Sequence, residues 1–434
     1  MKDGEGIYIL GGGMTGLAAG MVSGLPVLEA ADAPGGICSS YYIRPGEKAR
    51  LNSSPQDGEA YRFEHGGGHW IFGGDSLVLK FIEGLTPLKR YERSSAVYFA
   101  KTETYVPYPL QNNLRFLDKK IIEKSLAEVG RGEGPFRTMG QWIAGNFGAT
   151  LSELFFEPFH DLYTAGLHTK IAPQDAYKSP VSRELVEQGA KESAPPVGYN
   201  TTFAYPIEGL NALSQKMAER TAIQYSSRVV NISPKHKTLQ LESGQELGYR
   251  KLLSTLPLNR MLELCEVAVQ EKEDPFTSVL VLNIGAKRGA KCPDHHWHYN
   301  PDAEAGFHRV GFYSNVDVSF LPASYREKNA GVSIYVERAY VGGEKPEQGE
   351  IDRYAQAVVA ELQSWGYIDD AEVVDPTWID VAYTWKWPDS NWQHLAVSQL
   401  ESNEIYPIGR YGRWLFQGIA DSIRDGFFAG ASLR

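Results

Sequence analysis

Residues 7–17 read IYILGGGMTGL, and this stretch decides the fold. The apolar run 7–10 predicts a short buried strand, and the glycine motif that follows turns the chain into a helix. Gly11 allows the tight turn, Gly13 lets the backbone approach a pyrophosphate, and Gly16 lets the helix pack closely on the strand. Unpaired amides and the dipole of the helix N-terminus add affinity for phosphate. The stretch therefore predicts a dinucleotide cradle of the Rossmann type.

An acidic residue after the next apolar pair strengthens this interpretation. Val27 and Leu28 predict a second strand, and Glu29 follows 18 residues after Gly11. A carboxylate at that strand end can accept a hydrogen bond from a ribose hydroxyl. A purely structural glycine turn remains the alternative, because this glycine motif is a weak signal by itself.

Length and composition limit the class of protein. With 434 residues and 42% hydrophobic content, the chain can bury a large core divided over two or three domains. The formal net charge of -10 argues against nucleic acid as a partner. The three cysteines are far apart and show no CxxC spacing, so we expect no disulfide framework and no metal site. We find no signal peptide and no apolar run of about 18 residues, and we therefore expect a soluble, cytoplasmic protein without membrane insertion.

Two further glycine clusters predict a close approach of the backbone to a ligand. Gly35 and Gly36 form the first, shortly after the second predicted strand. The second lies in residues 63–72, FEHGGGHWIF, where three glycines stand between histidines. Glycine costs conformational entropy, so a bare backbone here indicates that a flat ring lies against the main chain. A flexible loop with two structural histidines is the alternative.

Residues 67–72 read GGHWIF, and residues 106–113 read VPYPLQNN. These segments resemble the Gly-Gly-His-x-Ile-Phe and the Val-Pro-Tyr-Pro-Phe-Gln-Asn-Asn of UDP-galactopyranose mutases, most of all those of the eukaryotic-type branch. The resemblance implies that the first segment lies beside the flavin of FAD, and that Tyr108 and Gln111 contact the uracil. Without this resemblance, residues 108–113 would be interpreted as the end of a strand that is bounded by a proline.

A third block extends the resemblance. Trp297-His298-Tyr299, followed ten residues after Tyr299 by Arg309, is similar to the Trp-x-Tyr and pyrophosphate arginine of the mutases. An arginine suits a diphosphate because its planar fork donates two parallel hydrogen bonds and stays charged. The alternative is a strand arginine in a routine ion pair.

Residues 409–414, GRYGRW, resemble a fourth block of the family and bring the chain back to FAD. Positions that face the sugar or the diphosphate in the family depart from its pattern. Thr164 stands in place of a tryptophan, Phe416 in place of a tyrosine, and Trp387 lies in a segment that replaces a Tyr-Pro motif. The basic residue that would complete the diphosphate site is left open among Lys170, Lys178 and Arg183.

Residues 203–254 resemble the returning half of the FAD domain in glutathione-reductase-like flavoproteins, which implies that Val230 touches the adenine through its backbone. The predicted cofactor contacts are Gly11, Gly13, Thr15, Gly16, Glu29, Gly35, Gly36, Gly67, Gly68, His69, Val230, Gly409, Arg410 and Ser422. The predicted substrate contacts are Tyr108, Gln111, His160, Trp297, Tyr299, Arg309, Trp387 and Phe416. His69 and Arg309 are the predicted catalytic residues, beside a flavin that does most of the chemistry.

The predicted fold is α/β, with a Rossmann-like FAD-binding domain, a helical insertion and an antiparallel β-sheet domain for the substrate. Apolar residues at helical spacing in 119–165 predict the helices, and β-branched and aromatic residues in 277–284, 306–313 and 331–337 predict the sheet. The predicted domains are 1–85, 200–265 and 400–434 for FAD, 108–199 for the helices, and 86–107 and 266–399 for the sheet.

The resemblance implies a flavin-dependent mutase that interconverts the pyranose and furanose forms of a UDP-sugar, UDP-galactose or a related one. Reduced FAD would attack the anomeric carbon through N5, with NADH or NADPH as the electron donor, and the protein could be a homo-oligomer. Two alternatives stay open. The first is an FAD oxidoreductase of the amine oxidase or protoporphyrinogen oxidase type. The second is a protein that binds FAD and a nucleotide sugar without turnover.

Overall fold

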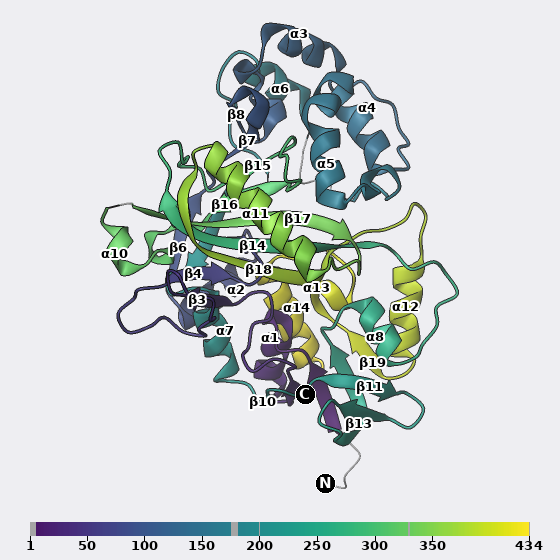
Figure 1. The fold of residues 1–434 in the computed structure, drawn as a ribbon. Coiled ribbons are helices and arrows are strands. Elements are labelled where there is room, and N and C mark those ends of the chain that lie inside the picture. The colour runs from purple at the N-terminus through teal and green to yellow at the C-terminus, as the bar shows by residue number, and fades with distance from the viewer. Residues whose placement is uncertain (1–5, 175–180, 199, 329, 434) are drawn as a thin grey trace.

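The computed structural model describes residues 6–174, 181–198, 200–328 and 330–433. Three layers follow one another from the N-terminus upward in Figure 1: a parallel sheet with its helices, a large antiparallel sheet, and a cap of helices. The predicted α/β fold is confirmed. None of the described helices is both long enough and apolar enough to cross a bilayer.

The first layer is the predicted dinucleotide-binding sheet. Its parallel strands lie in the order β10, β2, β1, β13, β19, which are Ile223–Gln224, Val27–Leu28, Gly6–Leu10, Glu246–Ser254 and Ile405–Pro407. The central strand β1 pairs with β13, so that Ile9 lies opposite Leu253. Segments from both ends and from the middle of the chain therefore build this sheet together. An antiparallel ribbon, β11 (Val229–Ser233) and β12 (Thr238–Leu241), extends it from β13.

Two helices pack closely beneath the glycine turn. α1 (Met14–Ser23) starts directly after β1, and α14 (Ile419–Ala431) lies against it. A Cβ atom on Gly426 would come within 2.2 Å of the backbone oxygen of Thr15, and one on Gly430 within 2.4 Å of that of Ala19. These two glycines allow the close helix pair, which brings the start of α14 beside the turn.

The second layer is the predicted antiparallel sheet. Its order is β18, β14, β17, β16, β15, β7, β8, which are Ile368–Thr384, Phe276–Arg288, Gly331–Val341, Arg309–Phe312, Trp297–Tyr299, Ser95–Phe99 and Thr104–Pro107. All pairs are antiparallel except β15 with β7. The strand predicted at 306–313 is shorter than expected, because the chain turns at Gly306 and because Tyr313 already begins the short helix α9 (Tyr313–Val316).

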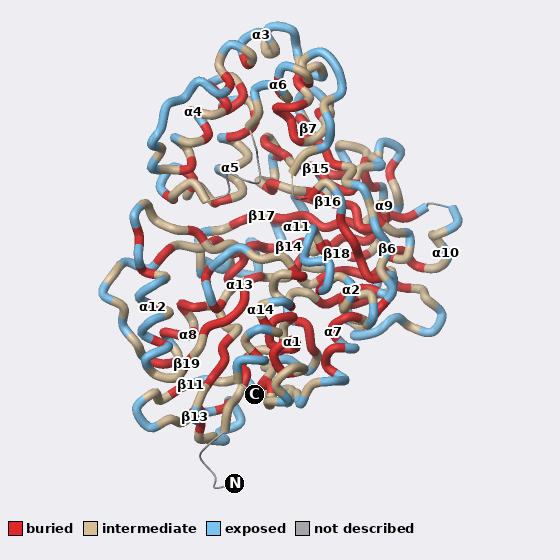
Figure 2. The backbone as a smooth tube through the Cα atoms, turned by 180° about the vertical axis from the view of Figure 1, so that it is seen from behind, coloured by how far each residue is buried: buried red, intermediate tan, exposed pale blue. Residues whose placement is uncertain are grey.

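Both faces of this sheet are covered. On β14, Leu280 and Leu282 pack toward α11 (Gln348–Ser364), whereas Val279 and Val281 pack toward the first layer. Strands that are buried on both faces have continuous apolar sequences. Figure 2 shows β14 and β17 buried along most of their length, while the outer helices of the cap are largely exposed.

The cap consists of α3 (Lys119–Glu128), α4 (Met139–Leu151), α5 (Glu157–Thr164) and α6 (Arg183–Gly189). Between α4 and α5, residues Ser152–Phe156 form a π-helical turn, a feature that is frequent at functional sites. α5 lies close to β17, so the cap touches the sheet there.

The remaining elements connect these layers. They are β3 (Ser40–Ile43), β4 (Tyr61–Glu64), β5 (Ile71–Phe72), α2 (Ser76–Leu85), β6 (Leu88–Glu92), β9 (Thr202–Pro206), α7 (Leu210–Ala218), α8 (Leu258–Leu264), α10 (Ala323–Arg326), α12 (Trp392–Glu401) and α13 (Gly409–Gly412). Strands β5, β9 and β6 form one small sheet, and β3 pairs with β4.

Candidate cofactor and substrate site

A cavity of about 550 Å³ lies where the two large sheets and the cap meet. One end of its lining is the glycine turn at the start of α1, and the other is the aromatic face of α5. β14, β17, β18 and the segment from α13 to α14 supply the walls between these ends. All three layers therefore contribute to one site.

The glycine turn forms an open cradle on the cavity wall. Gly11 has a φ of +96°, which favours glycine, and a Cβ atom on Gly16 would come within 1.9 Å of the oxygen of Gly11. A Cβ atom on Gly13, in contrast, would meet no other heavy atom within 4 Å. Glu29 is fixed beside the turn, because its carboxylate accepts hydrogen bonds from the amides of Gly12 at 2.5 Å and Ala31 at 2.8 Å.

The glycines of the second cluster make room for side chains of β17. A Cβ atom on Gly67 would come within 2.8 Å of Oε1 of Glu337, and one on Gly68 within 2.2 Å of the hydroxyl of Tyr335. The bare backbone predicted at this segment is therefore required by the sheet behind it. Gly68 also lines the cavity, so its other side remains open to a ligand.

His69 presents a neutral ring to the cavity. Burial disfavours the charged form and, together with the positive charge of Arg410, lowers the pKa of His69 from 6.5 to about 4. Its Nδ1 atom is buried beside the backbone of Gly66.

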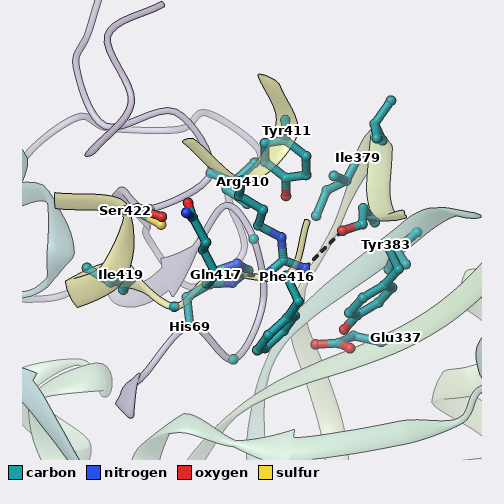
Figure 3. A pocket seen from close by; sticks show the side chains of 18 of the residues that line it. His69, Glu337, Ile379, Tyr383, Arg410, Tyr411, Phe416, Gln417, Ile419 and Ser422 are labelled. Carbon is teal, nitrogen blue, oxygen red and sulfur yellow. Dashed lines mark hydrogen bonds between the residues drawn. The ribbon is translucent and has the colours of Figure 1, made fainter. Parts of the chain in front are cut away.

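Arg410 lies on α13 and is a half-buried cation of the cavity wall. Figure 3 shows its side chain reaching toward the backbone of β18, where Nη2 donates to the oxygen of Ala382 at 3.1 Å. Nη1 donates to the oxygen of Gln417 at 3.2 Å, and the guanidinium lies 4.8 Å from the ring centroid of Phe416. These contacts hold one positive charge in the cavity wall.

Arg309 is the second cation of the described cavity wall, and it is paired. Its Nε donates to Oε2 of Glu337 at 3.0 Å, and its Nη2 contacts Oε1 at 2.6 Å and Oε2 at 2.5 Å. Burial alone would raise the pKa of Glu337, but the charge of Arg309 and a contact with His308 outweigh it and lower this pKa to about 2. The pair therefore stays ionised at neutral pH.

Aromatic rings surround this pair. The centroids of Tyr108 and Tyr299 are 4.6 Å apart, Phe159 meets Tyr299 edge-on at 5.3 Å, and Tyr163 meets Tyr383 edge-on at 4.8 Å. Rings of this kind bind a flat base or an apolar group through their faces and edges.

The structure brings most of the predicted contacts to the cavity. Those that line it are Gly11, Gly13, Thr15, Glu29, Gly35, Gly36, Gly68, His69, Gly409, Arg410, Ser422, Tyr108, His160, Tyr299, Arg309 and Phe416. Those outside its lining are Gly16, Gly67, Val230, Gln111, Trp297 and Trp387. Gly16 and Gly67 instead shape the wall from behind.

The other predicted contacts outside the lining have different surroundings. Trp297 is 2% exposed and meets Phe72 edge-on at 6.2 Å, and Gln111 is fully buried. Trp387 donates through Nε1 to the oxygen of Glu273 at 2.8 Å. The side chain of Val230 is exposed on β11.

Of the three candidates for a second phosphate-binding residue, two lie outside the cavity lining. Lys170 is exposed, and Arg183 on α6 is exposed and pairs with Glu187 at 2.8 Å. Lys178 lies outside the described residues.

Several residues of the lining were not predicted from the sequence, among them Glu337, His308, Tyr383, Asn200, Phe155, Phe156 and Phe159. The aromatic residues of α5 recur at helical spacing, and that pattern was a usable signal. No residue near Glu337 in the sequence indicates that it belongs to the site. It lies beside Arg309 only because the register of β16 with β17 places the two residues opposite each other.

A buried carboxyl group beside the second glycine cluster gives a pH-dependent prediction. Burial raises the pKa of Glu64 from 4.5 to about 7, and its Oε2 atom has no described partner. Between these values the folded protein keeps a proton that the unfolded chain releases, so folding stability falls as the pH rises. Between pH 5 and pH 8, the free energy of unfolding of the wild type should fall by up to about 3 kcal/mol for this reason, and Glu64→Gln should remove this fall.

Urea unfolding of both proteins at the two pH values measures these free energies. An equal fall in the wild type and in Glu64→Gln would contradict the prediction.

No protein-family model matches this chain. Among solved structures, a reduced UDP-galactopyranose mutase superposes with a TM-score of 0.82 at 21% identity, covering 98% of this chain and 94% of that one. A candidate protoporphyrinogen oxidase from an Exiguobacterium species gives 0.71 at 15% identity, with 99% and 98% covered. Cyclohexylamine oxidase from Brevibacterium oxydans gives 0.60 at 14%, again with 99% and 98% covered. The chain therefore has the fold that this mutase and these oxidases share.

Proposed function

We propose that this protein is an FAD-dependent enzyme that interconverts the pyranose and furanose forms of a UDP-sugar. One observation carries the proposal: a single cavity joins the glycine cradle to an arginine that is surrounded by aromatic rings. A cofactor at one end and a nucleotide sugar at the other would share this space. The similarity to a solved UDP-galactopyranose mutase supports the same assignment.

The described residues fit FAD. The open space above Gly13 is a place where a pyrophosphate can approach the amides of α1, and Glu29 lies at the strand end suited to a ribose. Gly68, His69 and Arg410 would then border the flavin ring. When bound and reduced, FAD supplies a nucleophilic nitrogen for the anomeric carbon of the sugar.

The other end of the cavity suits a nucleoside diphosphate. Tyr108 and Tyr299 offer ring faces for a base, and Arg309 offers N–H groups for a phosphate. A mutase breaks the bond between sugar and diphosphate and later forms it again. Arg309 would therefore hold the diphosphate in place between the two steps, and the aromatic walls would exclude water.

A second candidate function, FAD-dependent oxidation, is favoured by a different observation. Arg309 is already paired with a buried carboxylate, and much of the lining around it is aromatic. Such a site suits an amine or a ring compound as well as a phosphate. Two of the superposed proteins are oxidases by name.

One experiment separates the two candidates. Dithionite-reduced protein is incubated with UDP-galactose and with other UDP-hexoses and UDP-pentoses, and pyranose and furanose forms are separated by chromatography. We expect conversion of at least one UDP-sugar by the reduced protein only. Oxygen consumption with an amine or ring substrate, together with no conversion of any UDP-sugar, would reject the mutase proposal in favour of oxidation.

A further inference from the structure

Arg309 and Glu337 lie directly opposite each other on the paired strands β16 and β17. Both line the cavity, but the side chain of Arg309 is 21% exposed and that of Glu337 only 2%. The arginine therefore reaches the open space, and the carboxylate lies behind it. Gly67 makes this position possible, because a Cβ atom there would come within 2.8 Å of Oε1 of Glu337.

The hydrogen bonds between Arg309 and Glu337 show which edge of the guanidinium contacts the carboxylate. Glu337 accepts from Nε and Nη2, which form the side edge of the arginine fork. No described residue accepts a hydrogen bond from Nη1, so the end edge remains for a ligand. An anion can bind that edge without displacing the carboxylate.

The charge of Arg309 is offset at close range, and Arg410 is the other cation of the described cavity wall. Arg309 and Glu337 together are neutral, and His308 lies 3.5 Å from Oε2 of Glu337. Burial keeps His308 neutral by lowering its pKa. Tyr383 is also neutral, because burial raises its pKa to about 12. An anion on the end edge of Arg309 would therefore meet a cation whose charge is already offset, with a carboxylate close behind it.

We propose that Glu337 is the built-in counter-anion of Arg309 and that it limits how tightly this cavity holds a phosphate-bearing ligand. The identity of that ligand, a UDP-sugar, rests on the proposed function. A carboxylate behind the arginine repels a phosphate in front of it, and this repulsion is stronger beside the protein interior than in bulk water. An enzyme of this kind must hold the leaving diphosphate and then return it to the sugar. Moderate affinity for the diphosphate favours both steps, because very tight binding would oppose its return.

The test is Glu337→Gln in the FAD-loaded protein, with inorganic pyrophosphate, UDP and uridine as probes. Glutamine keeps the length and one acceptor for Arg309 but removes the charge. We expect the Kd of pyrophosphate and of UDP, measured by calorimetry, to fall about tenfold. The Kd of uridine, which carries no phosphate, should not change. Pyrophosphate binding that is unchanged or weaker in this variant would overturn the proposal.

Two further variants keep the test decisive. Glu361→Gln alters a carboxylate on α11 that accepts from the amides of Glu304 and Ala305 outside the cavity lining, and it should leave every Kd unchanged. Glu337→Asp keeps the negative charge, so its pyrophosphate Kd should stay within about threefold of the wild type. A tenfold gain in the aspartate variant would overturn the proposal even if the glutamine variant fails to fold.

The outcomes also separate this proposal from the proposed function. Tighter pyrophosphate binding in Glu337→Gln supports the counter-anion whether or not any UDP-sugar is converted. Conversion of a UDP-sugar by a wild type whose pyrophosphate affinity does not respond to Glu337→Gln would leave the mutase standing and overturn the counter-anion.

Discussion

Replacement of Arg309 by alanine is expected to weaken UDP binding by roughly 100-fold or more. The change removes the end edge of the guanidinium that would contact the phosphates, and it leaves the buried carboxyl group of Glu337 without its cation. Loss of one partner of a hydrogen-bonded charge pair between protein and ligand costs on the order of 2–5 kcal/mol in binding. Calorimetry with UDP on the FAD-loaded variant measures the effect.

Two control variants make this result interpretable. Arg183→Ala removes an exposed arginine of α6 that pairs with Glu187, and it should leave the affinity unchanged. Arg309→Lys keeps a positive charge for Glu337 but loses the fork, so an intermediate loss is expected. A UDP affinity that is equal in wild type and Arg309→Ala would remove Arg309 from the site.

Replacement of Gly13 by valine is expected to abolish FAD binding while the protein still folds. Gly13 has a φ of -72° and a ψ of 178°, which any residue adopts, and a Cβ atom there meets nothing within 4 Å. The new side chain would fill the space where the pyrophosphate would lie. We expect bound FAD, measured by absorbance after release, to fall below roughly a tenth of the wild-type content, with an unchanged circular dichroism spectrum.

Gly84→Val is the matched control, because a Cβ atom on Gly84 in α2 also meets nothing within 4 Å and this residue is not part of the cavity lining. It should retain FAD in full. Full FAD content in Gly13→Val would show that the cradle does not hold the cofactor.

Local patterns in the sequence predicted much of the fold, and the resemblance of residues 203–254 to other flavoproteins predicted its returning strands. The run 7–17 specifies β1, the turn and α1 through apolar residues and glycines that are neighbours in sequence. Continuous apolar and β-branched runs specify β14 and β17, because both faces of these strands are buried. Strand limits were less certain, because pairings such as that of β3 with β4 are not a local property of the sequence.

Most site residues that were not predicted from the sequence owe their place in the site to contacts between strands that are far apart in the chain. Trp297 and Tyr299 lie on one strand at a spacing that places them on the same face, yet only Tyr299 lines the cavity, since Trp297 packs beneath Phe72. Glu337 is 28 residues from Arg309, and only the register of two strands brings them together. No spacing in the sequence encodes that pair.

The central claim is that reduced FAD and a UDP-sugar react in one shared cavity. The measurement that tests it most directly is chromatography of UDP-galactose after incubation with the dithionite-reduced wild type, with the oxidised protein and reduced Arg309→Ala as controls. We predict that UDP-galactofuranose forms only with the reduced wild type. Unchanged UDP-galactose and unchanged related UDP-sugars, with fully FAD-loaded and reduced protein, would contradict the claim.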